Sequence, residues 1–367
     1  MGLFSKKSSA DLNYLGVDIG GSSIKMVELT NNNGRAQLVT YGYLERSLKG
    51  NVKLIDAPDE TAGLIRKVAD KCRVVTARAI TALPGPAVFS SIISLPEISR
   101  RDLGSPKKVT AAVEWEAKNV LPLPLEEMIL DWKVIGSEEM LKKEGAAEEK
   151  IRNLQVLLTG AAKEVIQKYI DIFKKAGLEL ISLETESFAL ARSLVGKDKS
   201  TVILVDIGAV NTDISVIENA IPLLSRSVGI GGLEITREIS RTLNVSPEQA
   251  EQFKRDLAGQ TEEIGGEVLP EIIKRPVQAI VDETQYMINF YLEQPDNQNK
   301  KIERIVLAGG TAQLFNLPKV FTEQLGVRTF IGNPWARVIY PEDLQPILDN
   351  IGSRFATAIG LAMRDIE

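Results

Sequence analysis

The chain has 367 residues, of which 44% are hydrophobic and 25% are charged, a composition typical of a globular protein with more than one core. Its formal net charge of −5 provides no overall attraction to nucleic acid or to an anionic membrane. Histidine is absent and cysteine occurs once, which excludes histidine-based catalysis, histidine metal sites, disulfides within the chain and cysteine-rich zinc sites.

The first half begins with a short tail and continues as strands and helices. Residues 1–12 carry too few apolar residues for a signal peptide and are expected to be flexible, with weak contact with a membrane surface as the alternative. Strands are predicted over 15–30 and 36–44, and a helix over 59–72. No run of about 18 apolar residues occurs, so no transmembrane helix is expected.

The middle of the chain combines short strands with two helices. Strand, Pro-Gly turn and strand are predicted from 78, followed by an amphipathic helix that Pro122 and Pro124 end. A strand at 128–135 precedes a charged stretch, 136–150, that is expected to be an exposed loop. A further strand leads into a helix that Gly177 ends.

The second half repeats this alternation. A strand runs into a helix over 179–194, and a hairpin follows at 202–217. Two helices come next, the second opened by Ser246 and Pro247, and then a long helix that contains or begins at Pro276. Strand, Gly-Gly turn and helix precede a final short helix. The pattern predicts a mixed α/β chain built as two unequal, similar halves.

Each half opens with the same Asp-tipped hairpin. The first reads LGVDIGGSSIKMVEL from Leu15 and the second reads ILVDIGAVNTDISVI from Ile203. Small residues after the strand leave backbone N–H groups uncovered, and a nest of such donors binds phosphate oxygens. The carboxylate of Asp18 beside phosphate requires a cation between them, and Mg²⁺ fits because it accepts one or two carboxylates and keeps its waters. Two facing hairpins therefore predict a clamp for a triphosphate.

A third glycine-rich turn supports nucleotide binding. Gly309 and Gly310 follow a buried strand and precede a helix, so a flat adenine or ribose could approach the bare backbone. The chain contains neither the G-x-x-x-x-G-K-S/T motif nor the G-x-G-x-x-G motif. A P-loop enzyme or a dehydrogenase is therefore unsupported.

Hairpin, linking helix, hairpin and Gly-Gly turn, in this order, resemble the actin-like ATPase superfamily. Within it the chain resembles the PilM family of type IV pilus assembly, through LGVDIGGSSIKMVEL, EWEAKNVLPLPLEEMILDWKVI, GNPWARV and FATAIGLAMR. The resemblance covers nearly the whole chain. It implies an α/β, actin-like two-lobed ATPase fold with an inserted subdomain in the first lobe, arranged as in FtsA.

The resemblance also implies domain bounds. The first lobe is expected at 13–200, with the inserted subdomain at about 79–178. The second lobe is expected at 201–350, with a smaller helical subdomain at about 229–299. Residues 351–367 should form a C-terminal helix that packs back on the first lobe.

Site residues follow from the resemblance motif by motif. Glu184 matches the residue that positions the attacking water, and its other interpretation is an exposed helix-cap carboxylate. Glu251 and Lys254 match residues that touch ribose or adenine. Asp18 and Asp206 would hold Mg²⁺ through water. The remaining residues expected to bind ATP are Gly20, Gly21, Ser22, Ser23 and Lys25 in the first hairpin, Gly208, Ala209, Asn211, Thr212 and Asp213 in the second, and Gly309, Gly310 and Thr311 in the adenosine turn.

The second hairpin departs from the pattern of efficient ATPases. Ala209 and Val210 stand where those enzymes usually carry glycines, and Thr185 follows Glu184 where chaperone relatives carry proline. We therefore expect ATP binding with slow or negligible turnover.

The resemblance further implies a partner. In PilM proteins the inserted subdomain binds the short cytoplasmic N-terminal tail of the inner-membrane protein PilN. Trp115 and Val120, expected on one helix, belong to the apolar surface of that subdomain. The chain is accordingly expected to be cytoplasmic and to reach the inner membrane only through its partner. Contacts with other platform proteins and motor ATPases, and homo-oligomers, stay open, and no nucleic acid is expected.

Two other classes share the superfamily. FtsA-like division proteins form filaments and end in an amphipathic membrane helix, and the related GspL proteins continue into a transmembrane segment. This chain ends at LAMRDIE without either, which favours the PilM family. A small-molecule kinase would need an aspartate base, for which Asp213 or Asp131 could serve, but no substrate motif surrounds them.

Overall fold

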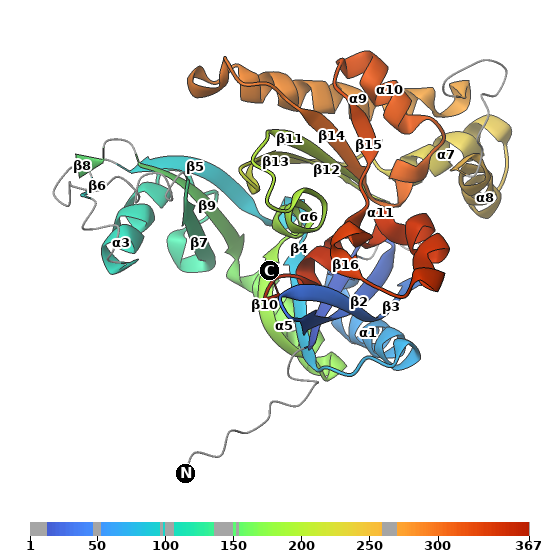
Figure 1. Ribbon diagram of the computed structural model, residues 1–367, viewed down its shortest axis with the longest axis horizontal. Coiled ribbons are helices and arrows are strands. Elements are labelled where there is room, and N and C mark those ends of the chain that lie inside the picture. The colour runs from blue at the N-terminus through green and yellow to red at the C-terminus, as the bar shows by residue number, and fades with distance from the viewer. Residues whose placement is uncertain are drawn as a thin grey trace, which may run out of the picture. The chain divides into compact units, whose positions relative to one another are not determined.

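The computed structural model describes residues 13–46, 53–95, 98–99, 106–135, 150–151, 154–258 and 270–366. The expected tail at 1–12 and most of the charged loop expected at 136–150 lie outside these residues. The chain divides into two compact units, one formed by Met1–Gly85 with Ile170–Glu367 and the other by Pro86–Tyr169. Figure 1 shows the elements of both units.

The first lobe of the larger unit is built on a six-stranded sheet. Leu15 and Val17 of β1 and Met26 of β2 are fully buried in its core. β1, β2 and β3 form an antiparallel meander, whereas β4 lies parallel to both β1 and β10. In spatial order the strands are β10 (Glu179–Thr185), β4 (Arg78–Leu83), β1 (Asn13–Ile19), β2 (Ser23–Asn32), β3 (Arg35–Glu45) and β16 (Val338–Ile339), and α1 (Pro58–Cys72) packs on β2 and β3.

The second lobe repeats the hairpin in a five-stranded sheet. In spatial order its strands are β13 (Ile221–Val228), β12 (Thr212–Glu218), β11 (Val202–Ile207), β14 (Arg304–Ala308) and β15 (Thr329–Ile331). Its helices are α7 (Gly232–Leu243), α8 (Pro247–Ala258), α9 (Glu271–Leu292) and α10 (Leu317–Leu325). α9 packs on β12 and β13, and α7 packs on α8 and α9.

The two hairpins share their register, which explains the repeated sequence. Asp18 pairs with Lys25 across β1 and β2, and Asp206 pairs with Asp213 across β11 and β12. The Gly20 N–H donates to the Ser23 carbonyl at 2.9 Å, and the Gly208 N–H donates to the Asn211 carbonyl at the same distance. Each lobe therefore presents an equivalent turn at the end of an equivalent strand.

A C-terminal helix packs into the core of the larger unit. α11 (Gln345–Ala362) begins earlier than the expected 351 and packs on β1, β2, β4 and α6 (Glu186–Leu190). Phe355 and Ile359 pack with Val27, Leu29 and Trp335 in one cluster. Glycines allow the close approach, because a β-carbon on Gly360 would overlap the Ala189 carbonyl. The helix thus packs against both the first-lobe sheet and α6.

The smaller unit has its own core. Its sheet has the antiparallel order β5 (Phe89–Leu95), β9 (Leu154–Ala162) and β7 (Met128–Val134), with a two-stranded ladder of β6 (Ile98–Ser99) and β8 (Lys150–Ile151). α3 (Pro106–Ala117) buries Val109 and Val113 against β5 and β9. Val120 lies in the turn after α3, so it does not share the helix of Trp115 as expected.

The smaller unit is narrower than the expected insert at 79–178. β4 belongs to the first-lobe sheet because it is paired with β1 and β10, so the smaller unit begins after it at Pro86. At the other end, α5 (Lys163–Ala176) starts in the smaller unit and finishes in the larger one. The insert is therefore joined to the larger unit by a short Pro-Gly-Pro stretch and by a continuous helix.

Helix ends follow local sequence signals. Ser246 and Gln249 exchange hydrogen bonds between side chain and backbone at 3.2 and 3.0 Å, which forms a capping box at the start of α8. Gly177, with φ of 77°, ends α5 as predicted. Within the described residues no helix is both long and apolar enough to cross a membrane.

Two glycine-to-alanine substitutions in helices should have opposite effects on stability. Gly360→Ala places a β-carbon into the Ala189 carbonyl and is expected to lower the free energy of unfolding by about 1–3 kcal/mol or more. Gly63→Ala in α1 meets open space and is expected to raise it by about 0.5–1 kcal/mol. Denaturant unfolding of both variants measures this, and a neutral Gly360→Ala would contradict the packing of α11 on α6.

Candidate functional site

Four carboxylates from both lobes lie near the two hairpin turns, close enough to influence one another's pKa. Asp18 ends β1, Asp206 and Asp213 lie opposite each other in the second hairpin, and Glu186 begins α6. Lys25 accompanies them, since its Nζ lies 2.7 Å from Oδ2 of Asp18 in a largely buried ion pair. The negative charge of these four carboxylates, when ionised, therefore exceeds the single positive charge of Lys25.

Burial and mutual repulsion favour the protonated forms of these side chains over the ionised forms. Burial, then Asp213 and Asp18, raise the pKa of Asp206 to about 7, against the opposing influence of Lys25. Burial also raises the pKa of Asp213. The pKa of Glu186 lies well above its ordinary value because of burial and the three aspartates, although a hydrogen bond from the Gly85 backbone opposes the shift. Such crowding predicts that a cation or a proton occupies the site.

The two turns approach each other closely. A β-carbon on Gly21 would lie 2.7 Å from Cγ2 of Val210, so the first turn needs a glycine where it meets the second. The second turn is tied to the start of α7, because Gly232 N–H donates to the Gly208 carbonyl at 2.9 Å and Leu233 N–H donates to the Ala209 carbonyl at 2.8 Å. The second turn is thus held in place by a helix N-terminus.

The Gly-Gly turn lies directly behind the second hairpin. Gly309 has φ of 85°, and a β-carbon there would lie 2.5 Å from Oδ1 of Asp206. Thr311 lies beside Gly232, whose β-carbon would be 2.6 Å from the threonine hydroxyl. The sequence-predicted adenosine turn and the second phosphate turn therefore form one continuous backbone surface.

Lys254 and Glu251 form a buried network next to this surface. Lys254 Nζ donates to the Gly232 carbonyl at 3.0 Å, to the Thr236 hydroxyl at 2.8 Å and to Glu251 at 2.7 Å. Burial lowers the pKa of Lys254, and the adjacent Glu251 carboxylate opposes this shift. Thr236, which the sequence did not indicate, completes the network by donating to Glu251 at 2.6 Å.

The other predicted residues hold the turns in shape. Ser22 accepts a hydrogen bond from the Arg46 backbone at 2.8 Å, Ser23 is buried, and the Thr212 hydroxyl donates to the Ile230 carbonyl at 2.7 Å. Gly310 opens a short 3₁₀ turn beside Arg354. Asn211 closes the second turn through its carbonyl.

Glu184 does not join the four carboxylates. Its two oxygens accept hydrogen bonds from Arg192 at 2.8 Å each, and Arg192 also donates to the Gly360 carbonyl at 2.5 Å. This bidentate pair attaches the end of β10 to α11. Glu186 is the glutamate that the structure brings to the hairpins, and the sequence signal for it was its position two residues later in the same ETE stretch.

One ion-pair cluster spans the larger unit beside this site. Glu45, at the end of β3, accepts a hydrogen bond from Arg255 of α8 at 2.9 Å and contacts Arg354 of α11. Burial works to raise the pKa of Glu45, but the hydrogen bonds and charges of Arg354 and Arg255 outweigh burial and lower it. Glu45 therefore joins the first-lobe meander to the helices behind the predicted adenosine turn.

The donor set fits a hydrated divalent cation. In the part of the chain that the structure describes, no three carboxylate, cysteine or histidine side chains are placed to bind a metal ion directly. Mg²⁺ characteristically keeps several waters and uses one or two carboxylates. The surplus of carboxylates around Asp18 and Asp206 is consistent with the expected contact through water.

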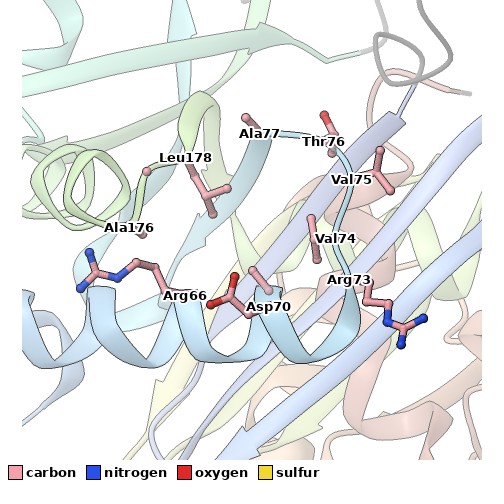
Figure 2. Close-up of a pocket in the computed structure, with 11 residues that line it drawn as sticks. Arg66, Asp70, Arg73, Val74, Val75, Thr76, Ala77, Ala176 and Leu178 are labelled. Carbon is pink, nitrogen blue, oxygen red and sulfur yellow. The ribbon is translucent and has the colours of Figure 1, made fainter.

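A surface pocket of about 400 Å³ lies elsewhere in the first lobe. Arg66 and Asp70 of α1, the extended stretch before β4 and the end of α5 line it (Figure 2). Arg66 already donates to the Lys175 carbonyl at 3.0 Å. The pocket includes none of the predicted site residues, so it has no part in the site at the hairpins.

The two lobes, each opening with an Asp-tipped hairpin, and the insert in the first lobe define an actin-like ATPase fold. The model of the type IV pilus assembly protein PilM family matches residues 16–366, and the chain belongs to this family. It is therefore a type IV pilus assembly component, which confirms the resemblance found in the sequence.

Among solved structures, one agrees with this assignment and another shares the fold. A solved PilM-PilN type IV pilus biogenesis complex matches with a TM-score of 0.77 and 26% identity, and the match covers 96% of this chain and 98% of that chain. EutJ from Carboxydothermus hydrogenoformans shares the fold, with a TM-score of 0.54, 18% identity and coverage of 95% and 89%.

Among curated relatives, FtsA of Pseudomonas aeruginosa is 24% identical over 96% of this chain and 89% of its own length. FtsA of Bacillus subtilis is 27% identical over 66% of this chain, and the match spans 58% of that relative. The chain is therefore also similar to the FtsA division proteins, the class that the resemblance gave as an alternative.

The stability of the protein should depend on pH through the buried carboxyls. The pKa of Asp206 is about 7 in the folded state and has its ordinary value of 3.8 in the unfolded state. Between these values the folded state binds a proton that the unfolded state does not, so stability is lost as pH rises toward about 7. Denaturant unfolding between pH 5 and pH 8 should show a shallower decline for Asp206→Asn than for the wild type, by up to about 1.4 kcal/mol per pH unit.

Asp198→Asn is the matched control for this measurement. A backbone hydrogen bond from Ser200 and the pairing with Arg304 lower the pKa of Asp198, so its contribution to stability is already complete above pH 5. Its pH slope should equal that of the wild type. Equal slopes for Asp206→Asn and the wild type would contradict the crowded carboxyl site.

Proposed function

We propose that this pilus assembly component binds ATP with Mg²⁺ between the twin hairpins. The observation that carries the proposal is the close approach of the two hairpin turns at Gly21 and Val210, beside an excess of carboxylates. The backbone N–H groups of the two turns would receive phosphate oxygens, and Lys25 would add a point charge. Mg²⁺, held through water by Asp18 and Asp206, would neutralise the phosphates.

The nucleoside would lie against the continuous surface behind the second hairpin. Gly309, Gly310 and Thr311 offer a backbone without bulky side chains, in keeping with the role inferred from the resemblance. Glu251 and Lys254 are proposed to reach ribose or adenine. Their present hydrogen bonds to each other and to Thr236 keep both side chains oriented toward Gly232.

We infer that turnover is slow. Val210 fills the space beside Gly21, so the second turn has less freedom to adjust to phosphate than a glycine turn would. Glu184 stays a prediction as the water-positioning residue, but its carboxylate is engaged by Arg192. Glu186 is the better candidate, because its proximity to the three aspartates supports a role at the terminal phosphate.

Lys25→Gln should weaken ATP binding. It removes the cation that pairs with Asp18 and would contact phosphate, and losing one charge-assisted hydrogen bond costs about 1.5–3 kcal/mol, or roughly 10- to 100-fold in affinity. Titration calorimetry with MgATP measures the change. The exposed Lys67 of α1 provides the control Lys67→Gln, which should bind as the wild type does.

Measuring phosphate release from MgATP tests the roles of Glu184 and Glu186 in hydrolysis. Turnover should lie well below the enzyme median of about 10 per second. Glu186→Gln should abolish it, and Glu184→Gln should keep MgATP affinity. Wild-type affinity in Lys25→Gln, or abolished turnover in Glu184→Gln alone, would refute these assignments.

We further propose that the smaller unit binds the cytoplasmic tail of a PilN-type membrane protein. The similarity to a PilM-PilN complex supports this partner, and the smaller unit exposes large apolar side chains on two sides. Trp115 is 70% exposed on α3, and Ile129 is 49% exposed on the face of β7 away from α3. An extended peptide could also add to an edge strand of this sheet, β5 or β7. Such binding would bring the chain to the inner membrane from the cytoplasm.

Substitution of an apolar contact in the smaller unit should weaken tail binding. Fluorescence anisotropy with a labelled PilN-type tail should give micromolar affinity in the wild type. Because large apolar anchors dominate such interfaces, Trp115→Ser or Ile129→Ser should reduce affinity at least about tenfold, and the affected variant identifies the binding side. Ile347→Ser, exposed on α11, is the control. Normal affinity in both insert variants would contradict the assignment.

A further inference from the structure

Gly85 occupies an unusual position in the chain. It follows β4, an interior strand of the first-lobe sheet, and it is the last residue of the larger unit before Pro86 opens the smaller one. Prolines precede and follow it in the sequence Leu-Pro-Gly-Pro. The chain therefore passes from the larger unit into the insert directly after this residue.

Gly85 contacts carboxylates of both lobes. Its backbone N–H donates a hydrogen bond to Glu186 of the first lobe. A β-carbon on it would overlap Oδ1 of Asp213 and contact Cβ of Ser227 at 3.4 Å. Asp213 and Ser227 are cross-strand partners in β12 and β13 of the second lobe. Because the Gly85 backbone packs directly against these groups, the backbone must follow if they move.

The flanking prolines make this stretch stiff. Each proline ring fixes its own φ near −65°, and each also restricts the residue before it, which here includes Gly85. A displacement of Gly85 is therefore not absorbed by free rotation next to it. β5 starts four positions later, at Phe89. Few residues therefore lie between Gly85 and β5 that could absorb a displacement.

We propose that Gly85 is a positioning residue that transmits the occupancy of the nucleotide site to the inserted unit, an inference that rests on the proposed binding of ATP. When phosphate and cation enter, Asp213 and Glu186 gain new partners, and the backbone packed against them shifts. The Pro-Gly-Pro stretch carries this shift into β5. Couplings of this kind typically change an equilibrium by about 5- to 150-fold.

Hydrogen exchange of the full chain tests the coupling directly. Wild-type protein is compared with and without Mg²⁺ and a non-hydrolysable ATP analogue, and amides of β5 and β9 are followed. We expect the analogue to change their exchange rates at least about fivefold in the wild type. Calorimetry on the same samples establishes whether the analogue binds.

Three variants locate the coupling. Gly85→Ala drives a β-carbon against Asp213 and should reduce the exchange change to less than about twofold. Pro86→Gly leaves every proposed nucleotide contact in place, loosens the stretch and should have the same effect, so it keeps the test valid if Gly85→Ala fails to fold. Gly229→Ala, which meets open space after β13, should retain the full wild-type change.

Two outcomes overturn the inference in distinguishable ways. If the wild type binds the analogue and its insert exchange is unchanged, or if Pro86→Gly keeps the full change, ATP binding stands and the role of Gly85 is wrong. If the wild type does not bind the analogue, the proposed function fails and the inference fails with it.

Discussion

The crowding of several partly buried carboxylates near the two hairpin turns is the constraint on which the rest of the structure depends. The ionised forms of four carboxylates repel one another there, and Lys25 supplies an opposing positive charge. The four are Asp18, Asp206, Asp213 and Glu186. Isolated strands would not hold these side chains together. The hydrogen-bonded register of the two hairpins and the packing of α11 under them supply the opposing stability.

The residues around this site divide into those that could meet a ligand and those that hold the frame. Arg192 clamps the end of β10 to α11 through Glu184 and the Gly360 carbonyl. Glu45 performs a comparable role between β3, α8 and α11. These ion pairs are satisfied within the protein, whereas the described carboxylates at the hairpin tips still exceed the positive charge beside them.

Much of this arrangement could be predicted from the sequence, because a repeated VDIG and the order of the turns identify the duplicated hairpins. The distinction between Glu184 and Glu186 could not, because β10 ends at Thr185 and the chain changes from strand to helix between them. The bounds of the insert were also beyond reach, since only the pairing of β4 with β1 and β10 assigns that strand to the first lobe. Gly85 had no local signal, because its neighbours come from distant β12 and β13.

The matched hairpins differ in charge at the position opposite the strand-end aspartate. Lys25 lies opposite Asp18 in the first, and Asp213 takes the equivalent place opposite Asp206 in the second. Two identical hairpins would offer a phosphate site without direction, in which an elongated anion could lie either way round. A lysine on one side and an aspartate on the other give the proposed site an electrical polarity. The repeated hairpin thus supplies the frame, and the difference between lysine and aspartate at this position supplies its orientation.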